Sequence, residues 1–411
     1  METAIVKPFR SQLEEAKFLP QAKVSDQWNK QSKIFKRLEK FLIWKAIKLK
    51  IFFYACLILK NPALILRIYK QMLSIRSNVW GGDLKKMHKI NGRYYFNMYT
   101  PGWPSNAYDQ LIKTELSRHI LPVVQTEKLS FVFFAITRKC PLRCEHCFEW
   151  DNLNKKETLS LTNILKAIDI YQKEGALQFH FSGGEPMVRI KDLLKILKYA
   201  SKKSECWVLS SGFNLNQKNA LALRNAGCTG IVISIDHYIA EVHDLFRGHE
   251  NSFQDAILAV KAAKNANMVV SVSVCATKSF IEGNHLIPYI EFAKNLGVQF
   301  IQVLEPRDLG NYTGKDVLLN ENHILQLEEI FLKVNHSAEY QNYPTLLYHG
   351  FHQRRIGCFS GSRSIYIDSA GDVHACPFCH TASYNIIDLI ESGELEIPQK
   401  ENQCPRFGKI A

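Results

Sequence analysis

The sequence has no run of eighteen uninterrupted apolar residues, so we predict no membrane-spanning helix. Its first thirty residues mix charged and polar side chains and lack the apolar centre of a secretory signal, so we expect no export. Eleven cysteines among 411 residues are too few for a scaffold held by disulfides. With 46% hydrophobic and 22% charged residues, the composition indicates a globular protein with a large core.

Acidic residues are scarce in residues 30–90, which hold fifteen Lys and Arg but only Glu39 and Asp83. This excess equals the whole formal net charge of +13, so the rest of the chain is balanced. Because the positive charge belongs to one segment and not to a broad surface, we predict no nucleic-acid partner.

Residues 34–78 predict two basic amphipathic helices. Apolar residues recur at helical spacing in both, Asn61-Pro62 ends the first and caps the second, and Gly81-Gly82 ends the unit. Lysines beside aromatic residues are typical of helices that lie on an anionic membrane surface. The alternative is a helical hairpin packed on the main domain, with its lysines simply in solvent. We expect a cytoplasmic protein, and the first interpretation places it peripherally on the inner face of the membrane.

Six strand–helix units follow a short hairpin predicted around Asn91-Gly92. The predicted strands are residues 129–137, 176–183, 206–211, 229–236, 268–277 and 298–305. Continuous apolar strands that alternate with helices indicate a parallel sheet covered by helices. We therefore predict an α/β fold, a partial (β/α)6 TIM-like barrel. The expected regions are 1–90 (basic helices), 91–127 (hairpin and linker), 128–310 (core) and 311–411 (a small cysteine-rich extension).

Three cysteines, Cys140, Cys144 and Cys147, follow the first predicted core strand in a C-x3-C-x2-C pattern. Three thiolates without a fourth protein ligand suit a cubane iron–sulfur cluster that keeps one iron open. The alternative is a zinc site with His146 as its fourth ligand. Glycine and polar residues also follow the later strands, and in parallel sheets this edge carries the active site.

These residues resemble the radical S-adenosylmethionine (SAM) superfamily, with "SGGEP" at residues 182–186 similar to its GGE motif. The resemblance implies a [4Fe-4S] cluster on the three cysteines, SAM on the open iron, and a 5′-deoxyadenosyl radical that takes hydrogen from a substrate. It implies that Glu185 pairs with the SAM ammonium, Asp236 contacts the ribose and Arg247 meets the carboxylate. The SAM-binding residues implied are His146, Gly183, Gly184, Glu185, Ser211, Ser234, Asp236 and Arg247.

A second cysteine set lies near the C-terminus: Cys358, Cys376, Cys379 and Cys404. Its C-x12-G-x4-C start resembles the SPASM and twitch extensions, which implies one auxiliary [4Fe-4S] cluster, although the C-x2-C-x5-C-x3-C run of a full SPASM domain is absent. "CPFCH" at residues 376–380 also spells a c-type haem attachment signal, which needs an exported protein. Free thiols are the remaining alternative.

The resemblance implies an enzyme that receives electrons from a flavodoxin or ferredoxin. SPASM-type relatives favour a peptide or protein substrate, whereas the basic N-terminal helices favour a lipid or isoprenoid at a membrane. A non-catalytic iron–sulfur electron carrier or scaffold is the alternative of another class. Five further side chains at predicted strand ends are candidates to line the cavity: His180, His237, Tyr238, Glu305 and Arg307.

Overall fold

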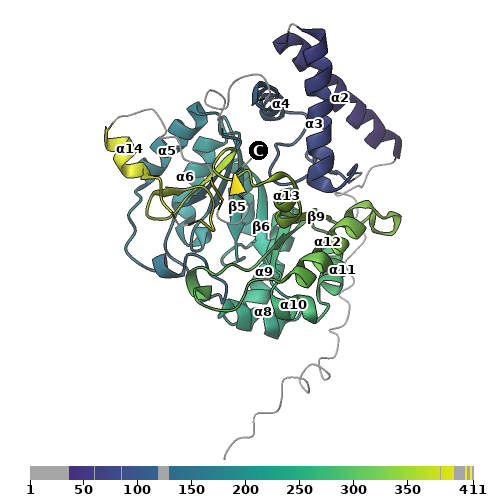
Figure 1. Cartoon of the computed structure of the whole chain (residues 1–411). Helices are drawn as coiled ribbons and strands as arrows, with labels where there is room; N and C mark the ends of the chain where they lie inside the picture. The colour runs from purple at the N-terminus through teal and green to yellow at the C-terminus, as the bar shows by residue number, and fades with distance from the viewer. Residues whose placement is uncertain are drawn as a thin grey trace, which may run out of the picture.

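The computed structural model describes residues 37–59, 61–84, 86–118, 129–379 and 381–392, and the backbone of 403–404 and 408–409. Its centre is a ten-stranded sheet with the order β12-β11-β10-β3-β4-β5-β6-β7-β8-β9. Helices cover the outer face of this curved sheet, and a pair of N-terminal helices stands away from it (Figure 1).

The six predicted core strands are confirmed, all parallel and adjacent in chain order. They are β3 (Phe131–Ala135), β4 (Gln178–Ser182), β5 (Glu205–Ser210), β6 (Cys228–Ser234), β7 (Val269–Cys275) and β8 (Phe300–Leu304). Valine, isoleucine and phenylalanine dominate them, and every residue of β7 is buried. Strands buried on both faces need a covering layer, which the intervening helices supply. These are α5 (Leu161–Lys173), α6 (Ile190–Ala200), α7 (Gln217–Asn225), α8 (Ala240–Arg247), α9 (Ser252–Asn265), α10 (Lys278–Glu282) and α11 (Leu286–Leu296).

The region after residue 310, which the sequence analysis described as a small cysteine-rich extension, adds strands to both ends of the core sheet. β9 (Thr345–Tyr348) continues the parallel order beside β8, and β10 (Ser364–Ile367) pairs in parallel with β3. The chain turns at Gly371 into a hairpin, because β11 (Asp372–His374) pairs antiparallel with β10 and then with β12 (Tyr384–Asn385). The helices here are α12 (Glu321–His336), α13 (His349–Ile356) and α14 (Ile386–Ser392).

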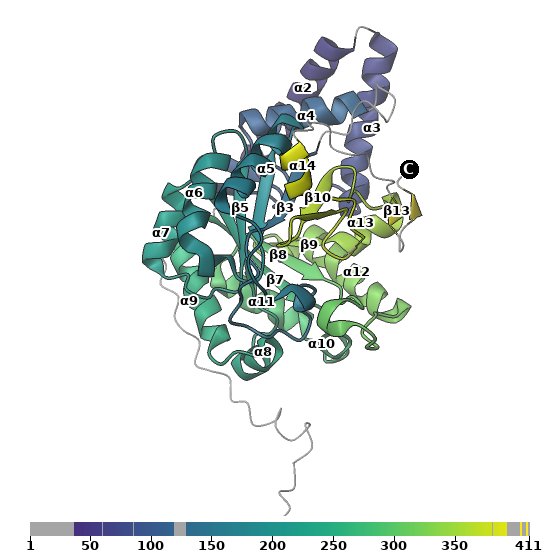
Figure 2. The ribbon, with the colours of Figure 1, turned by 90° about the vertical axis from the view of Figure 1, so that its left-hand side faces the viewer.

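The two predicted N-terminal helices are α2 (Arg37–Ile58) and α3 (Pro62–Trp80). The Asn61 side chain accepts hydrogen bonds from the backbone N–H groups that open α3, and Gly81 ends that helix at a φ of 66°. The hairpin of β1 (His88–Ile90) and β2 (Arg93–Tyr95) and the helix α4 (Asn106–Arg118) follow them in the chain. Figure 2 shows α4 beside α2 and α3. No helix among the described residues has the length and apolar content to cross a bilayer.

Candidate active site

The first cysteine loop follows β3 at the carboxyl edge of the sheet, where Cys140, Cys144 and Cys147 line one cavity of about 730 Å³. Its backbone is held from within, because Asn154 accepts from the Cys140 N–H at 3.1 Å and donates to the Cys140 carbonyl at 3.1 Å. Burial raises the pKa of Cys140 and of Cys147 to about 12. Both are therefore neutral thiols without a metal, and iron must replace their protons.

The glycine turn after β4 lies directly against this loop. Gly184 N–H donates to the Thr137 carbonyl at 2.8 Å, and Glu185 N–H donates to the Lys139 carbonyl at 2.8 Å. A Cβ on Gly184 would stand 2.4 Å from the Lys139 carbonyl oxygen and 2.9 Å from Cys140 Cβ. Only glycine permits this approach, so "SGGEP" fixes the position of the first cysteine.

Glu185 is fully buried and links the turns that follow β4 and β5. One carboxylate oxygen accepts from Met187 N–H (3.0 Å) and Ser210 Oγ (2.8 Å), and the other accepts from Ser211 N–H (2.7 Å) and Ser211 Oγ (2.6 Å). Burial raises the pKa of Glu185, and the hydrogen bonds from Ser211 are the largest of the effects that lower it. Four donors fill the acceptor positions, so a contact between this carboxylate and an ammonium requires one donor to move.

Arg247 connects the ends of β6 and α8 to the cysteine loop. Its Nη2 lies 2.5 Å from Oδ2 of Asp236, and its Nη1 donates to Sγ of Cys144 at 3.5 Å. Burial raises the pKa of Asp236, but Arg247, His146, His243 and the Cys275 N–H together outweigh this effect, so the net pKa is lowered. Asp236 is therefore a carboxylate that also accepts from the Cys275 N–H at 2.8 Å.

The turn at residues 246–248 also fixes the cysteine loop through its backbone. The Phe246 and Arg247 carbonyls accept from the N–H groups of Glu145 (2.8 Å) and Arg143 (3.0 Å). A Cβ on Gly248 would lie 2.5 Å from the Arg143 carbonyl oxygen. His146 stacks on Phe246 with ring centroids 4.8 Å apart, and burial lowers its pKa to about 4.

The loop after β8 supplies support that the sequence analysis did not assign. Asn311 donates from its backbone N–H to the Cys147 carbonyl at 3.0 Å and from its side chain to the Cys144 carbonyl at 3.2 Å. A Cβ on Gly310 would stand 2.3 Å from the Cys147 carbonyl oxygen. The polar segment "EPRDLGN" at the end of a predicted strand indicated that this loop lies at the active edge of the sheet. Nothing in the segment indicated which other loop it would contact.

The predicted SAM-binding residues come together from separate strand ends. All eight line the same cavity as the three cysteines: His146, Gly183, Gly184, Glu185, Ser211, Ser234, Asp236 and Arg247. Of the five further candidates, Glu305 and Arg307 line it, whereas His180, His237 and Tyr238 are absent from its described lining. His180 instead lies inside the barrel, stacked with Trp207 at 5.9 Å.

The second cysteine set reaches the same cavity. Cys358, Cys376 and Cys379 line it, Gln353 donates to Cys358 Sγ at 3.4 Å, and Cys379 N–H donates to the Cys376 carbonyl at 3.1 Å. The side chain of Cys404 and all of His380 lie outside the described residues, so the fourth ligand and the haem signal remain predictions.

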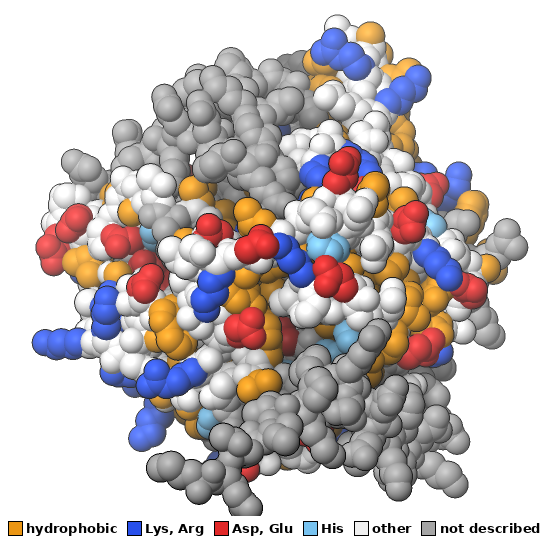
Figure 3. Space-filling view, turned by 60° about the horizontal axis from the view of Figure 1, so that its bottom comes forward, with side chains coloured by type: hydrophobic (Ala, Val, Ile, Leu, Met, Phe, Trp, Pro, Cys, Tyr) orange, Lys and Arg blue, Asp and Glu red, His pale blue; other side chains and the backbone are white. Residues whose placement is uncertain are grey.

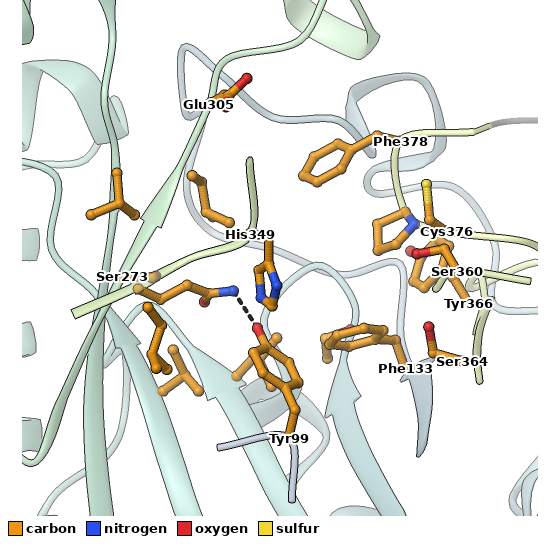
Figure 4. Close-up of a pocket in the computed structure, with 18 of the residues that line it drawn as sticks. Tyr99, Phe133, Ser273, Glu305, His349, Ser360, Ser364, Tyr366, Cys376 and Phe378 are labelled. Atoms are coloured by element: carbon orange, nitrogen blue, oxygen red, sulfur yellow. Dashed lines mark hydrogen bonds between the residues drawn. The ribbon is translucent and has the colours of Figure 1, made fainter. Parts of the chain in front are cut away.

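Phe148 and Phe378 join the two cysteine loops, with ring centroids 5.6 Å apart. Figure 4 shows Glu305, Cys376, Tyr366 and Phe378 facing the same space above Phe133 and Tyr99. The Tyr366 hydroxyl donates to the buried Glu149 carboxylate at 2.5 Å, which ties β10 to the first cysteine loop.

The donor set fits iron–sulfur clusters better than a single ion. Within the described residues, no three Cys, His, Asp or Glu side chains converge closely enough to hold one metal ion. Three thiols around a shared cavity, with a glycine cradle beside them, fit a cubane cluster with one open iron.

Comparisons with known proteins agree with this geometry. Residues 134–279 match the family model of the radical SAM superfamily. The "AdoMet-dependent heme synthase" of Oleidesulfovibrio alaskensis is 29% identical over 196 residues, which cover 47% of this chain and 50% of that protein. The "Antilisterial bacteriocin subtilosin biosynthesis protein AlbA" of Bacillus subtilis is 26% identical over 247 residues, 59% of this chain and 54% of that protein.

This chain therefore spans about half the length of these two curated relatives. Among solved structures, Streptococcus suis SuiB bound to the precursor peptide SuiA aligns with a TM-score of 0.54 at 14% identity, covering 72% of each chain, which shows a shared fold. Members of the matched family use a [4Fe-4S] cluster and SAM, the cofactors that this donor set fits. The motif, the fold and the family match agree that residues 134–279 form a radical SAM domain.

Proposed function

We propose that this protein is an enzyme that cleaves SAM reductively and abstracts a hydrogen atom from a substrate. The observation that carries the proposal is the convergence of Cys140, Cys144 and Cys147 with the strand-end residues on one cavity. A bound cluster supplies the electron that breaks the carbon–sulfur bond of SAM and yields the 5′-deoxyadenosyl radical. A flavodoxin or ferredoxin supplies that electron to the protein.

The protein's own residues position and shield this chemistry. The three cysteines hold the cluster, and Gly183 and Gly184 let SAM approach the backbone. Arg247 offers a cation beside Cys144, where it balances thiolate charge and meets the SAM carboxylate. Burial of these groups excludes water from the radical.

We also propose that Cys358, Cys376, Cys379 and Cys404 hold one auxiliary [4Fe-4S] cluster. The proximity of Phe148 to Phe378 favours electron transfer between the two sites. Four protein thiolates leave no open iron, so this cluster relays electrons rather than binding substrate.

Membrane association rests on the outer face of α2. Six large apolar side chains are at least half exposed there: Leu38, Phe41, Leu42, Leu49, Phe53 and Leu57. Figure 3 shows hydrophobic and basic side chains together on the projecting helices. An apolar stripe flanked by lysines suits an anionic lipid surface, so we place the protein on the cytoplasmic side of a membrane.

The substrate class has two candidates. AlbA is named for bacteriocin biosynthesis, which favours a peptide or protein. The exposed face of α2 favours an amphiphilic lipid or isoprenoid instead.

Anaerobic reconstitution with iron, sulfide, SAM and a reductant tests the enzyme proposal. We expect 5′-deoxyadenosine from the full chain, none above background from Cys144→Ala, and wild-type amounts from Cys56→Ala, which changes an exposed thiol on α2. Equal, background product from all three proteins supports the alternative, a non-catalytic iron–sulfur carrier.

A further inference from the structure

One wall of the cavity is not explained by either cofactor. It is formed by the N-terminal helices α3 and α4, outside the region that matches the radical SAM family. The lining residues on this wall are Met72, Ile75, Arg76, Val79, Trp80, Leu111 and Glu115. Those on α3 recur at intervals of three and four, so they occupy one face of the helix.

This face of α3 is apolar except for Arg76, and its apolar side chains pack into the protein mainly toward the two ends of the helix. Met72 packs with Ile68 toward α2, and Trp80 stacks on Phe331 of the core at 6.2 Å. Ile75, between them, is half-buried and belongs to none of the hydrophobic clusters of the described residues, although it lines the cavity. An apolar helix face that borders a cavity is a surface for a hydrophobic ligand.

The two charged residues of the wall are engaged with other parts of the protein. Arg76 lies 3.6 Å from the ring centre of Trp44 and donates to the Leu84 carbonyl at 3.1 Å. Glu115 accepts from Arg363 at 2.9 Å. A peptide backbone brings one N–H and one carbonyl per residue, and each needs a partner when buried. This wall offers mainly methyl and methylene groups, which suit a hydrocarbon chain better.

The wall also lies next to the surface that we propose for membrane contact. α2 packs against α3 and α4 through Ala55, Leu59, Ile68, Ile112 and Leu116, while its opposite face carries the exposed leucines and phenylalanines. The same three-helix unit thus presents one apolar face outward and another to the cavity.

We propose that α3 and α4 bind the acyl or prenyl chain of an amphiphilic substrate drawn from the membrane. This inference rests on the proposed SAM-dependent function. The chain lies along Met72, Ile75 and Val79, and the part of the molecule that loses hydrogen extends toward the SAM side of the cavity.

Photo-crosslinking tests the proposal. The probe is a palmitic acid that carries a diazirine, added to the reconstituted full chain with SAM, and mass spectrometry maps the adducts. We expect adducts within residues 72–80 and 111–115. Ile75→Asp places a carboxylate in the wall and lowers this labelling by about tenfold or more, which corresponds to about 1.4 kcal/mol. Ile75→Trp fills the space beside the wall, so we expect it to lower the labelling as well, without adding a charge. Ser74→Asp, on the exposed side of the same helix, retains the labelling.

Two results overturn the proposal. One is labelling confined to residues 38–58, which indicates partition onto the outer surface. The other is labelling of the wall by a photo-leucine peptide but not by the fatty acid, which assigns the substrate to peptides. Formation of 5′-deoxyadenosine is measured on the same samples. A loss of hydrocarbon binding at the wall is thereby distinguished from a loss of SAM cleavage. Thermal unfolding of each variant confirms that it is folded.

Discussion

Arg247 and Asp236 form a buried ion pair directly behind Cys144, with 2.5 Å between their nearest nitrogen and oxygen. Both side chains are less than a tenth exposed. Asp236 is the predicted ribose contact, Arg247 is the predicted contact to the SAM carboxylate, and Cys144 is a predicted cluster ligand. Because Arg247 contacts both of the others, we expect a change at one of the three to affect the other two.

Asp236→Ala leaves Arg247 charged and buried without its partner. We expect it to lower the free energy of unfolding of the metal-free protein by about 3–5 kcal/mol, measured by urea denaturation. Asp316→Ala removes the partner of Lys278 in an ion pair in which the Asp316 side chain is 94% exposed, so it costs less than about 1 kcal/mol. Equal losses in the two variants contradict the assignment of a buried pair.

Gly184→Ala tests whether the glycine turn positions the first cluster. The added methyl group collides with the Lys139 carbonyl and with Cys140, so the loop must shift and iron binding by the first three cysteines is lost. We expect the reconstituted protein to lose about four iron atoms per chain, measured by iron analysis. Gly92→Ala meets no atom within 4 Å, and the strain of an alanine at its φ of 78° stays in the distant β1–β2 turn, so its iron content stays at the wild-type value.

Replacement of Cys376 and Cys404 by alanine tests the auxiliary cluster. Iron should fall from about eight to about four per chain, while the cluster at the first loop persists. Cys56→Ala serves as the matched control, because this thiol is exposed on α2 and does not line the cavity. An unchanged iron count in the double variant refutes the second site.

The membrane proposal is tested with Leu42→Asp combined with Leu49→Asp, which places two carboxylates on the outer face of α2. Loss of apolar burial of about 1.5–3 kcal/mol per leucine predicts at least a tenfold weaker association with phosphatidylglycerol vesicles. Sedimentation with the vesicles measures it, and wild-type binding should also weaken as salt rises. Leu325→Asp changes a leucine on α12 that is 52% exposed and leaves binding intact. Binding by the double variant equal to that of wild type contradicts the proposal.

Glu205 predicts a specific pH dependence of stability. Burial raises the pKa of this carboxyl to about 7, against the opposing Gly102 N–H and Arg93. Between about pH 4.5 and 7 the folded state holds a proton that the unfolded state has released, so the free energy of unfolding falls as pH rises. Glu205→Gln lacks this component, so its stability relative to wild type should rise across that window and level off above pH 7, measured by denaturation at each pH. A constant difference contradicts the raised pKa.

Local pattern was sufficient to predict the six core strands and the edge of the sheet where the first cysteine loop lies. β3 to β8 are apolar runs separated by helices, and each ends at a polar or glycine segment, which fixes the edge where Cys140 and Glu185 meet. Chain order alone does not reveal which strand lies beside which. The pairing of β10 with β3, for example, depends on tertiary packing.

The supporting contacts were also beyond sequence reasoning. Asn311 holds the Cys144 and Cys147 carbonyls from a loop more than a hundred residues away in the chain, and no spacing rule connects them. Glu185 was expected to face an ammonium, whereas Ser210 and Ser211 occupy its oxygens. The α3 wall follows from where the helix packs, which its amphipathic pattern does not specify.

The parallel pairing of Phe131 with Ser364 has a consequence for biosynthesis. The outer edge of β3 has no neighbour until most of the chain has left the ribosome, so the nascent protein exposes an unpaired apolar strand throughout translation of the barrel. The hydrogen bond between Tyr366 and Glu149 likewise cannot form until β10 has been synthesised. A truncated chain that ends before residue 364 is thus expected to aggregate, and completion of the polypeptide acts as the step that commits it to the native state.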